Sequence, residues 1–218
     1  MKRSEINQAL REARDMLVTY RCALPPWANW TVDDHRSHAE TSAHLRAHQM
    51  GWDVTDFGSG DFGKRGLTLF CVRNGIQSDP SSAPYAEKLL FVDEGQETPF
   101  HSHHAKMEDI INRGGGNLIV EFRHEDGDTG AIHILVDGRK VELQPDEPLR
   151  LMPGESVTIP RRLYHRFYGE AGRGKVFVGE VSQVNDDRTD NYFLEPLGRF
   201  SEVEEDEPAI LPLWNEIN

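Results

Sequence analysis

Three histidines and a glutamate lie between His101 and Glu108, within the stretch GQETPFHSHHAKMEDI. His101 and His103 are two positions apart, so on a β-strand both side chains point to the same face. Glu108 follows a short break at residues 104–106 and is expected to begin the next strand. Two imidazoles and one carboxylate that converge in this way bind a divalent first-row metal ion and leave positions open for substrate or water. The spacing therefore predicts a metal site.

A fourth candidate ligand, His165, lies about sixty residues further on, in PGESVTIPRRLYHRFYG. This segment is predicted to begin with a turn at Pro153-Gly154, to run as an apolar strand and to end at Tyr164-His165. Spacing alone does not place His165 beside the first three residues, but a closed antiparallel barrel brings distant strands together at one mouth. The alternative is a hydrogen-bonded polar cluster that holds no metal.

Two more ionisable residues are predicted to point into the same interior. Strand alternation places Glu180 on one face with Val178, and Lys88 on one face with Leu90. An inward carboxylate in a partly apolar pocket has its ionised form disfavoured, which makes it a stronger base. The alternatives are a core glutamate paired with an arginine, and a strand-end lysine in solvent.

The chain beyond Glu180 is dense in polar residues. It can close the barrel mouth over a polyhydroxyl ligand, or it can be an ordinary charged surface loop. The residues concerned are Asp186, Asp187, Arg188, Asp190, Asn191 and Arg199.

A second group of histidines has the opposite interpretation. His44 and His48 are four residues apart and can share a helix face, but no carboxylate completes a zincin-like HExxH motif. We expect roles in helix packing or at the surface for the whole group, which is His35, His38, His44 and His48.

Short runs rich in Val, Leu, Ile and Phe must position these residues. Gly, Pro, Asp and Asn separate the runs at intervals of about ten residues, and Asp137-Gly138 in VDGRKVEL is a hairpin turn signal. Eight or more strands at this pitch predict an antiparallel sandwich or barrel over residues 52–185.

Residues 1–51 are predicted to form a helical layer packed on the barrel. A first helix has Ser4 as its N-cap and ends before CALPPWANW, and a second covers about 33–50. Residues 186–218 are predicted to be an irregular C-terminal arm, with the acidic run 202–207 as a solvated face or tail. We expect one structural domain overall.

Composition narrows the class of partner. The 218 residues include 24 basic and 37 acidic side chains, which give a formal net charge of −13. Binding to nucleic acid or to an anionic membrane depends on Lys and Arg, so we expect neither partner and favour a neutral polar substrate. The sequence shows no secretion signal and no apolar run of about 18 residues. We therefore expect a cytoplasmic protein in which Cys22 and Cys71 are reduced thiols, with a disulfide as the alternative.

Two motifs resemble those of the cupin superfamily. Gly95, His101-x-His103 and Glu108, followed by glycines at 114–116, resemble the first cupin motif. The resemblance implies a mainly β fold, a cupin-type antiparallel β-barrel (jelly roll).

Gly154, Pro160 and His165 resemble the second cupin motif, which usually has glycine at the position of Arg162 and asparagine at that of Gly169. With both motifs present, the resemblance implies that the metal ligands are His101, His103, Glu108 and His165.

Over nearly its full length the chain resembles the D-lyxose isomerase family of bacterial cupins. The resemblance implies interconversion of a free aldose and its ketose, D-lyxose with D-xylulose and also D-mannose with D-fructose. It also implies a divalent metal ion, with Mn²⁺ expected and Zn²⁺, Co²⁺ or Fe²⁺ as alternatives, and it suggests a homodimer. The segments that carry it are PPWANW, FCVRNG, YAEKLLFVDEGQETPFHSHHAKMEDIINRGGG, SVTIPRRLYHRF and GEVSQVNDDRTDNYFLEP.

This chemistry assigns further roles. Glu180 is expected to be the base that moves a proton between C1 and C2, and Lys88 to stabilise or protonate the substrate oxygens. Glu108 is expected to contact substrate as well as metal, and Asp190 and Arg199 to hold the distal hydroxyls.

Three other functions stay open. An iron-dependent cupin dioxygenase uses the same ligand set. An isomerase of phosphorylated sugars needs an inward basic cluster, for which Arg161, Arg162 and Arg166 are the candidates. The third is a non-catalytic sugar-binding module.

Overall fold

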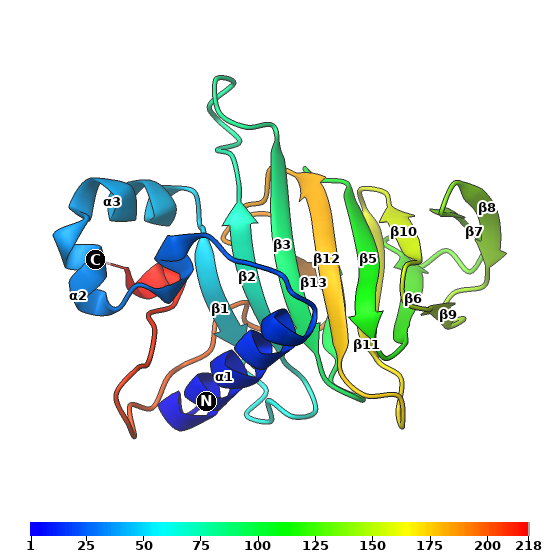
Figure 1. Cartoon of the computed structure of the whole chain (residues 1–218). Coiled ribbons are helices and arrows are strands. Elements are labelled where there is room, and N and C mark those ends of the chain that lie inside the picture. The colour runs from blue at the N-terminus through cyan, green and yellow to red at the C-terminus, as the bar shows by residue number, and fades with distance from the viewer. Residues whose placement is uncertain (218) are drawn as a thin grey trace.

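A computed structural model describes residues 1–217 of the chain, which fold as two antiparallel β-sheets with helices at the N-terminal end (Figure 1). The helical elements are α1 (Arg3–Thr19), η1 (Pro26–Asn29), α2 (Val32–Ser37), α3 (Ala39–Ala47) and η2 (Trp214–Glu216). The predicted first helix is confirmed, but its N-cap is Lys2 and not Ser4. The second predicted helix is two helices, because His38 leaves helical geometry at φ −123° and ψ 51°.

The strands form a larger and a smaller sheet. The larger sheet has the order β1-β2-β3-β12-β5-β10-β7-β8, and the smaller has the order β13-β4-β11-β6-β9. Their bounds are β1 (Gly51–Thr55), β2 (Leu67–Arg73), β3 (Tyr85–Val92), β4 (Thr98–Ser102), β5 (Glu108–Gly115), β6 (Leu118–His124), β7 (Ile132–Val136), β8 (Arg139–Leu143), β9 (Leu149–Leu151), β10 (Ser156–Ile159), β11 (Leu163–Gly169), β12 (Val176–Gln183) and β13 (Tyr192–Phe193).

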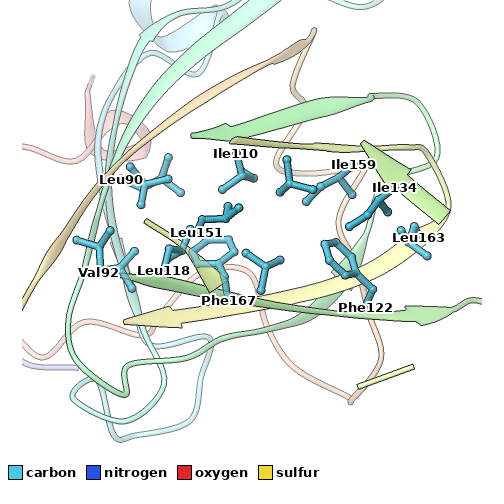
Figure 2. Packing of buried hydrophobic residues seen from close by; sticks show 14 of the residues in the cluster. Leu90, Val92, Ile110, Leu118, Phe122, Ile134, Leu151, Ile159, Leu163 and Phe167 are labelled. Atoms are coloured by element: carbon cyan, nitrogen blue, oxygen red, sulfur yellow. The ribbon is translucent and has the colours of Figure 1, made fainter. Parts of the chain in front are cut away.

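The main hydrophobic core lies between the two sheets (Figure 2). Leu90 of β3 and Val178 of β12 point into it, whereas Phe91 and Phe177 point to the opposite face of the same strands and pack in a second cluster with α1. Because part of the larger sheet is covered on both faces, its strands are continuous apolar runs there instead of strict alternations.

Two turns show how local sequence sets the topology. The predicted hairpin is confirmed: β7 pairs with β8 around Asp137 and Gly138, whose φ angles of 48° and 78° are those of a type I′ turn. The single strand predicted to end at His165 is wrong, since β10 stops before Pro160 and His165 lies inside β11. Between them Arg162 has φ 62°, a left-handed conformation that favours the glycine usual in this motif.

The acidic run 202–207 is largely exposed, as expected, but it is not a free tail. It lies along the first turn of α1, where Ser4 donates both its backbone N–H and its hydroxyl to Asp206. The buried Arg3 guanidinium donates to Glu205 at 2.6 Å and to Glu216 at 2.5 Å. Carboxylates beside the N-terminus of a helix also meet its positive end. These contacts join the C-terminal segment to α1.

Cys22 and Cys71 are both free. Within residues 1–217, none of the helices combines the length and the apolar character needed to cross a membrane.

Replacing Arg3 with alanine should lower the free energy of unfolding by about 1.5–3 kcal/mol, because charged hydrogen bonds to two carboxylates are lost. Urea denaturation measures the change. Arg11→Ala is the matched control on the same helix, since Arg11 is half exposed and 4.0 Å from Glu207, and it should change the value by less than about 1 kcal/mol. Equal losses at the two positions would contradict the structural role given to Arg3.

Candidate metal centre

Strands of both sheets bring the four predicted ligands together. His101 of β4 lies opposite His165 of β11 in the register of the smaller sheet, and His103 follows the end of β4. Glu108 is the first residue of β5 in the larger sheet, as predicted. All four are buried, and their ligand atoms lie within 4.8 Å of one another. The cluster can therefore hold a divalent metal ion.

Backbone carbonyls orient the three imidazoles. The Nδ1 atoms lie 2.8, 2.5 and 3.1 Å from the carbonyl oxygens of Pro99, Asp190 and Leu163, in the order His101, His103, His165. A carbonyl can only accept a hydrogen bond, so each Nδ1 carries the proton and each Nε2 presents a lone pair. This is the arrangement in which histidines ligate metals through Nε2.

The surroundings of the Nε2 atoms indicate whether the site suits a cation. Those of His103 and His165 are buried and find no hydrogen-bond partner within residues 1–217, yet they lie 3.5 and 2.8 Å from Oε1 of Glu108. Burial lowers the pKa of His101 well below its usual value, and burial followed by the charge of Lys106 lowers the pKa of His103. Lone pairs that converge on a carboxylate without a proton between them repel one another, and a bound cation removes the repulsion. The donor set thus fits a divalent metal.

His104 points away from this cluster. Its Nε2 lies 2.7 Å from Oε1 of Glu125, and its ring stacks on Tyr192 at a centroid distance of 3.8 Å. Two adjacent histidines therefore lie in different environments.

Lys106 is a site residue that sequence reasoning missed. Its Nζ lies 2.8 Å from Oε2 of Glu108 and 2.8 Å from Oε1 of Glu180, and its side chain is 2% exposed. Burial alone would raise the pKa of Glu108, but the charge of Lys106 outweighs burial and holds that pKa well below its usual value. The available signal is parity, because Lys106 is two residues before Glu108, but the sequence pattern predicts a break between strands at residues 104–106.

Glu180 and Lys88 both point into the barrel, as predicted. Glu180 is 5% exposed and Lys88 4% exposed, and Nζ of Lys88 lies 3.4 Å from Oε1 of Glu180. The predicted net effect, an ionised form of Glu180 that is disfavoured, is wrong. Burial acts in that direction, but the charges of Lys106 and Lys88 outweigh it, so the pKa of Glu180 is lowered. Glu180 is thus a paired carboxylate, with lysines in place of the arginine considered as an alternative.

Arg199 lies at the other end of this ionic chain. One of its terminal nitrogens contacts Asp53 at 2.7 Å and Asp187 at 3.1 Å, while the other, NH1, is buried and has no hydrogen-bond partner in the described part of the chain. Burial alone would raise the pKa of Asp187, but the charges of Arg199 and Lys88 lower it. Asp187 is also 3.9 Å from Lys88, so charged contacts continue from Glu108 to Arg199.

Asp190 is predicted to hold a distal hydroxyl of the substrate, but its carboxylate contacts the protein backbone. It accepts hydrogen bonds from the backbone N–H groups of His104, Ala105 and Lys106, at 2.8 to 3.2 Å. Because the carbonyl of Asp190 also accepts from His103, this residue holds the loop that carries a ligand and a buried lysine.

A cavity of about 30 Å³ lies at the centre of the site. Of the two alternatives for the polar segment beyond Glu180, the structure favours the one that closes the mouth, since Asn191, Phe193 and Arg199 line this cavity together with Phe57. The other polar lining residues are Lys88, Thr98, His101, His103, Lys106, Glu108 and Glu180.

The second histidine group has packing and surface roles, as expected. His35 is buried with its Nδ1 2.9 Å from Oγ of Ser42, and His44 stacks on His48 at the surface of α3. Within residues 1–217, the His101 cluster is the one group found whose His, Cys, Asp or Glu atoms converge closely enough to hold a metal.

Comparison with known proteins finds similarity over the full length. A family model described as D-lyxose isomerase matches residues 1–217. A D-lyxose/D-mannose isomerase of Escherichia coli O157:H7 is 46% identical, with 99% of this chain and 98% of that protein covered. A protein of the same name from Serratia proteamaculans is 45% identical, with 98% and 95% covered.

Solved structures are similar in fold. The L-ribose isomerase of Cellulomonas parahominis with L-psicose superposes with a TM-score of 0.63 at 16% identity, covering 94% of this chain and 98% of that one. The L-ribose isomerase of Acinetobacter sp. DL28 with L-ribose gives 0.61 at 14% identity, with the same coverage. The predicted mainly β, cupin-type fold with N-terminal helices is thereby confirmed.

Replacing His103 with alanine should abolish tight binding of Mn²⁺, because one of four convergent donors is lost. Isothermal titration calorimetry and the metal content of the purified protein both report the effect. His104→Ala is the matched control, since the neighbouring ring points to Glu125, and this variant should keep its metal. Retention of metal by the His103 variant would refute the ligand set.

Proposed function

This chain belongs to the D-lyxose isomerase family, and on that premise we propose that it is a metal-dependent isomerase of free aldoses and ketoses. The proposed substrates are D-lyxose, converted to D-xylulose, and D-mannose, converted to D-fructose, a choice supported by the names of the two relatives. One observation carries the chemistry. Three residues of the metal cluster, His101, His103 and Glu108, line a single cavity with Lys106, Glu180 and Lys88, which can move a proton and hold the oxygens beside it.

Isomerisation moves a proton between C1 and C2 of the open-chain sugar through an enediol. The C–H bond beside a carbonyl is a weak acid, so a base must reach both carbons from one face while the adjacent oxygens are stabilised. A divalent ion held by His101, His103, Glu108 and His165 supplies Lewis-acid polarisation of the carbonyl and hydroxyl oxygens.

Glu180 is the proposed base. Its lowered pKa keeps it ionised at neutral pH, so the form that accepts a proton is present before substrate arrives. Its Oε1 is held by Lys106 at 2.8 Å and Lys88 at 3.4 Å. When substrate oxygens become partners of these ammonium groups, the carboxylate loses part of its stabilisation and becomes a stronger base.

Lys106 and Lys88 are proposed to donate hydrogen bonds to the oxygens on C1 and C2 and to return a proton to them. Both are buried within the cavity, where a charged donor acts more strongly than in water. Lys106 extends the assignment made from sequence. It also contacts Glu108, so it lies between the metal cluster and the base.

Arg199 is proposed to hold a distal hydroxyl through NH1, the donor that has no partner among residues 1–217. Asp190 is proposed to act on substrate indirectly, by fixing the loop of residues 104–106. Mn²⁺ is the proposed metal, because three imidazoles and a carboxylate suit a first-row divalent ion. A homodimer, a cytoplasmic location and the division into residues 1–51, 52–185 and 186–218 stay predictions.

The isomerase of phosphorylated sugars has less support. The arginines considered for its phosphate site bond elsewhere: Arg166 to Glu97 and Glu121, Arg161 to Gln183, and Arg162 to Glu125. None of the three lines the cavity.

The purified protein should convert free aldoses to ketoses when assayed on a panel of pentoses and hexoses. Activity should disappear in EDTA and return with Mn²⁺, and it should be the same with and without O₂, because the isomerisation has no net oxidation. Ketose formation measured by chromatography checks the result. Turnover that requires O₂ would favour the dioxygenase, and no conversion of any aldose by the metal-loaded protein would refute the proposal.

Glu180→Gln should reduce kcat by about 10²–10⁴-fold while the metal content stays unchanged, because the proton acceptor is lost and the shape is kept. Among the described residues, the side chain forms its ion pairs with lysines and none with the imidazoles, so metal loss would indicate a structural role. Glu142→Gln, on the exposed strand β8, is the control and should behave like the natural protein. Full activity of the Glu180 variant would remove this residue from the role of base.

A further inference from the structure

One hydroxyl at the central cavity has no hydrogen-bond partner. Thr98 lines the cavity of the metal centre and is 3% exposed. Its Oγ1 atom is buried, and none of residues 1–217 forms a hydrogen bond with it. An unpaired polar group in the interior lowers stability, and native structures keep few of them. The hydroxyl of Thr98 therefore needs a reason that the empty protein does not supply.

A bulge in β4 turns Thr98 toward the cavity. His101 is the register partner of His165 and Thr98 is the partner of Phe167, so three steps along β4 match two steps along β11. On a regular strand, a separation of three would point Thr98 and His101 to opposite faces. The extra residue of the bulge restores them to the same face, and Pro99 lies within it, at a place where sheets accept proline. The backbone is thus irregular at the point that aims this side chain inward.

Thr98 brings a polar atom to the apolar part of the cavity. The charged Lys88 and Glu180 are register partners, and Leu90, two residues beyond Lys88 on β3, points into the main core. On the smaller sheet Phe167, the partner of Thr98, belongs to the same core, and Figure 2 shows both Leu90 and Phe167 there. Thr98 therefore faces a region where the strands no longer supply charged groups.

The hydroxyl also differs in kind from the other polar groups of the cavity. The ammonium group of Lys88 can only donate hydrogen bonds and the ionised carboxylate of Glu180 can only accept them, whereas the Thr98 hydroxyl can do both. Among the described residues that line the cavity, Thr98 alone carries a hydroxyl. A neutral hydroxyl set among apolar side chains suits another neutral hydroxyl, on a carbon chain whose C–H groups pack against those side chains.

We propose that Thr98 is a specificity-determining residue that forms a hydrogen bond with one hydroxyl on C3 to C6 of the sugar. The inference rests on the proposed function. In that function the oxygens on C1 and C2 belong to the metal, Lys88 and Lys106, so the hydroxyl at Thr98 comes from the remainder of the chain. A sugar that lacks this hydroxyl leaves Oγ1 buried and unpaired, and such a site rejects it more strongly than a site that loses an apolar contact.

Thr98→Val removes the hydroxyl and keeps the branched shape of the side chain. In the metal-loaded protein without sugar, the midpoint of urea unfolding should stay the same or rise, because a buried group without a partner is gone. A midpoint lower than that of the natural protein would show that the hydroxyl stabilises the empty fold, and it would overturn the inference.

The same variant should lose about 10–100-fold in kcat/KM on D-mannose, because the bound hydroxyl loses its partner. The matched sugars are the 3-, 4-, 5- and 6-deoxy analogues of D-mannose. For one of these analogues Thr98→Val should change kcat/KM by less than about 2-fold, since the two deletions remove the same hydrogen bond. Thr98→Ser keeps the hydroxyl and should keep most of the activity.

Thr68→Val is the matched control for the loss of a buried hydroxyl. Thr68 on β2 is 4% exposed and lies beside α1, on the face of the larger sheet away from the metal centre. This variant should have the kinetics of the natural protein on every sugar.

Sugar affinity separates this inference from the proposed function. Isothermal titration calorimetry on the Glu180→Gln protein measures affinity with little turnover, and adding Thr98→Val should lower that affinity by about the factor seen in kcat/KM. Unchanged kinetics of Thr98→Val, or equal losses on all four analogues, would overturn the role of Thr98 and leave the isomerase intact. A chain that binds these sugars through Thr98 and converts none would refute the proposed function alone, and a chain that binds no sugar would overturn both.

Discussion

The buried ammonium group of Lys106 is the contact on which the rest of the site depends. A charge removed from water is costly unless it is paired, and here one cation is paired with two carboxylates that come from different strands. Those carboxylates in turn contact the imidazole cluster on one side and Lys88 on the other. Removing any member would leave its neighbours buried without partners, so the site is held as a unit.

The fold supplies that unit with rigid supports. His101 and His165 lie in the smaller sheet, whereas Glu108, Glu180 and Lys88 lie in the larger one, so the site spans the gap between the two sheets. The core of apolar side chains fills the remainder of this gap (Figure 2). The C-terminal segment then covers the mouth, and its bonds to Arg3 anchor it to α1 on the far side of the larger sheet.

Predictions from sequence were most accurate where strand parity or a single turn determines the structure. His101 with His103, the inward direction of Glu180 and Lys88, and the Asp137-Gly138 hairpin all follow from one strand or one turn. Predictions failed where a contact with a residue far away in the sequence determines a property of the site. The pKa of Glu180 depends on Lys106, 74 residues away, and no local pattern announces that pairing. Likewise, the sequence predicts that Asp190 binds a substrate hydroxyl. Its carboxylate instead accepts hydrogen bonds from three backbone amides 84 to 86 residues earlier in the chain, and no local pattern around Asp190 indicates this.

The size of the central cavity has a consequence for how ligands are chosen. About 30 Å³ holds water but is smaller than any sugar, so no sugar fits while Asn191, Phe193 and Arg199 keep these positions. Opening of the mouth must then occur in every catalytic cycle, and a rigid docking search against this conformation would reject true substrates. Selection has two stages. On the proposed function, the mouth first admits a molecule by its bulk and flexibility, and only afterwards would the lysines and Arg199 discriminate by the positions of its oxygens.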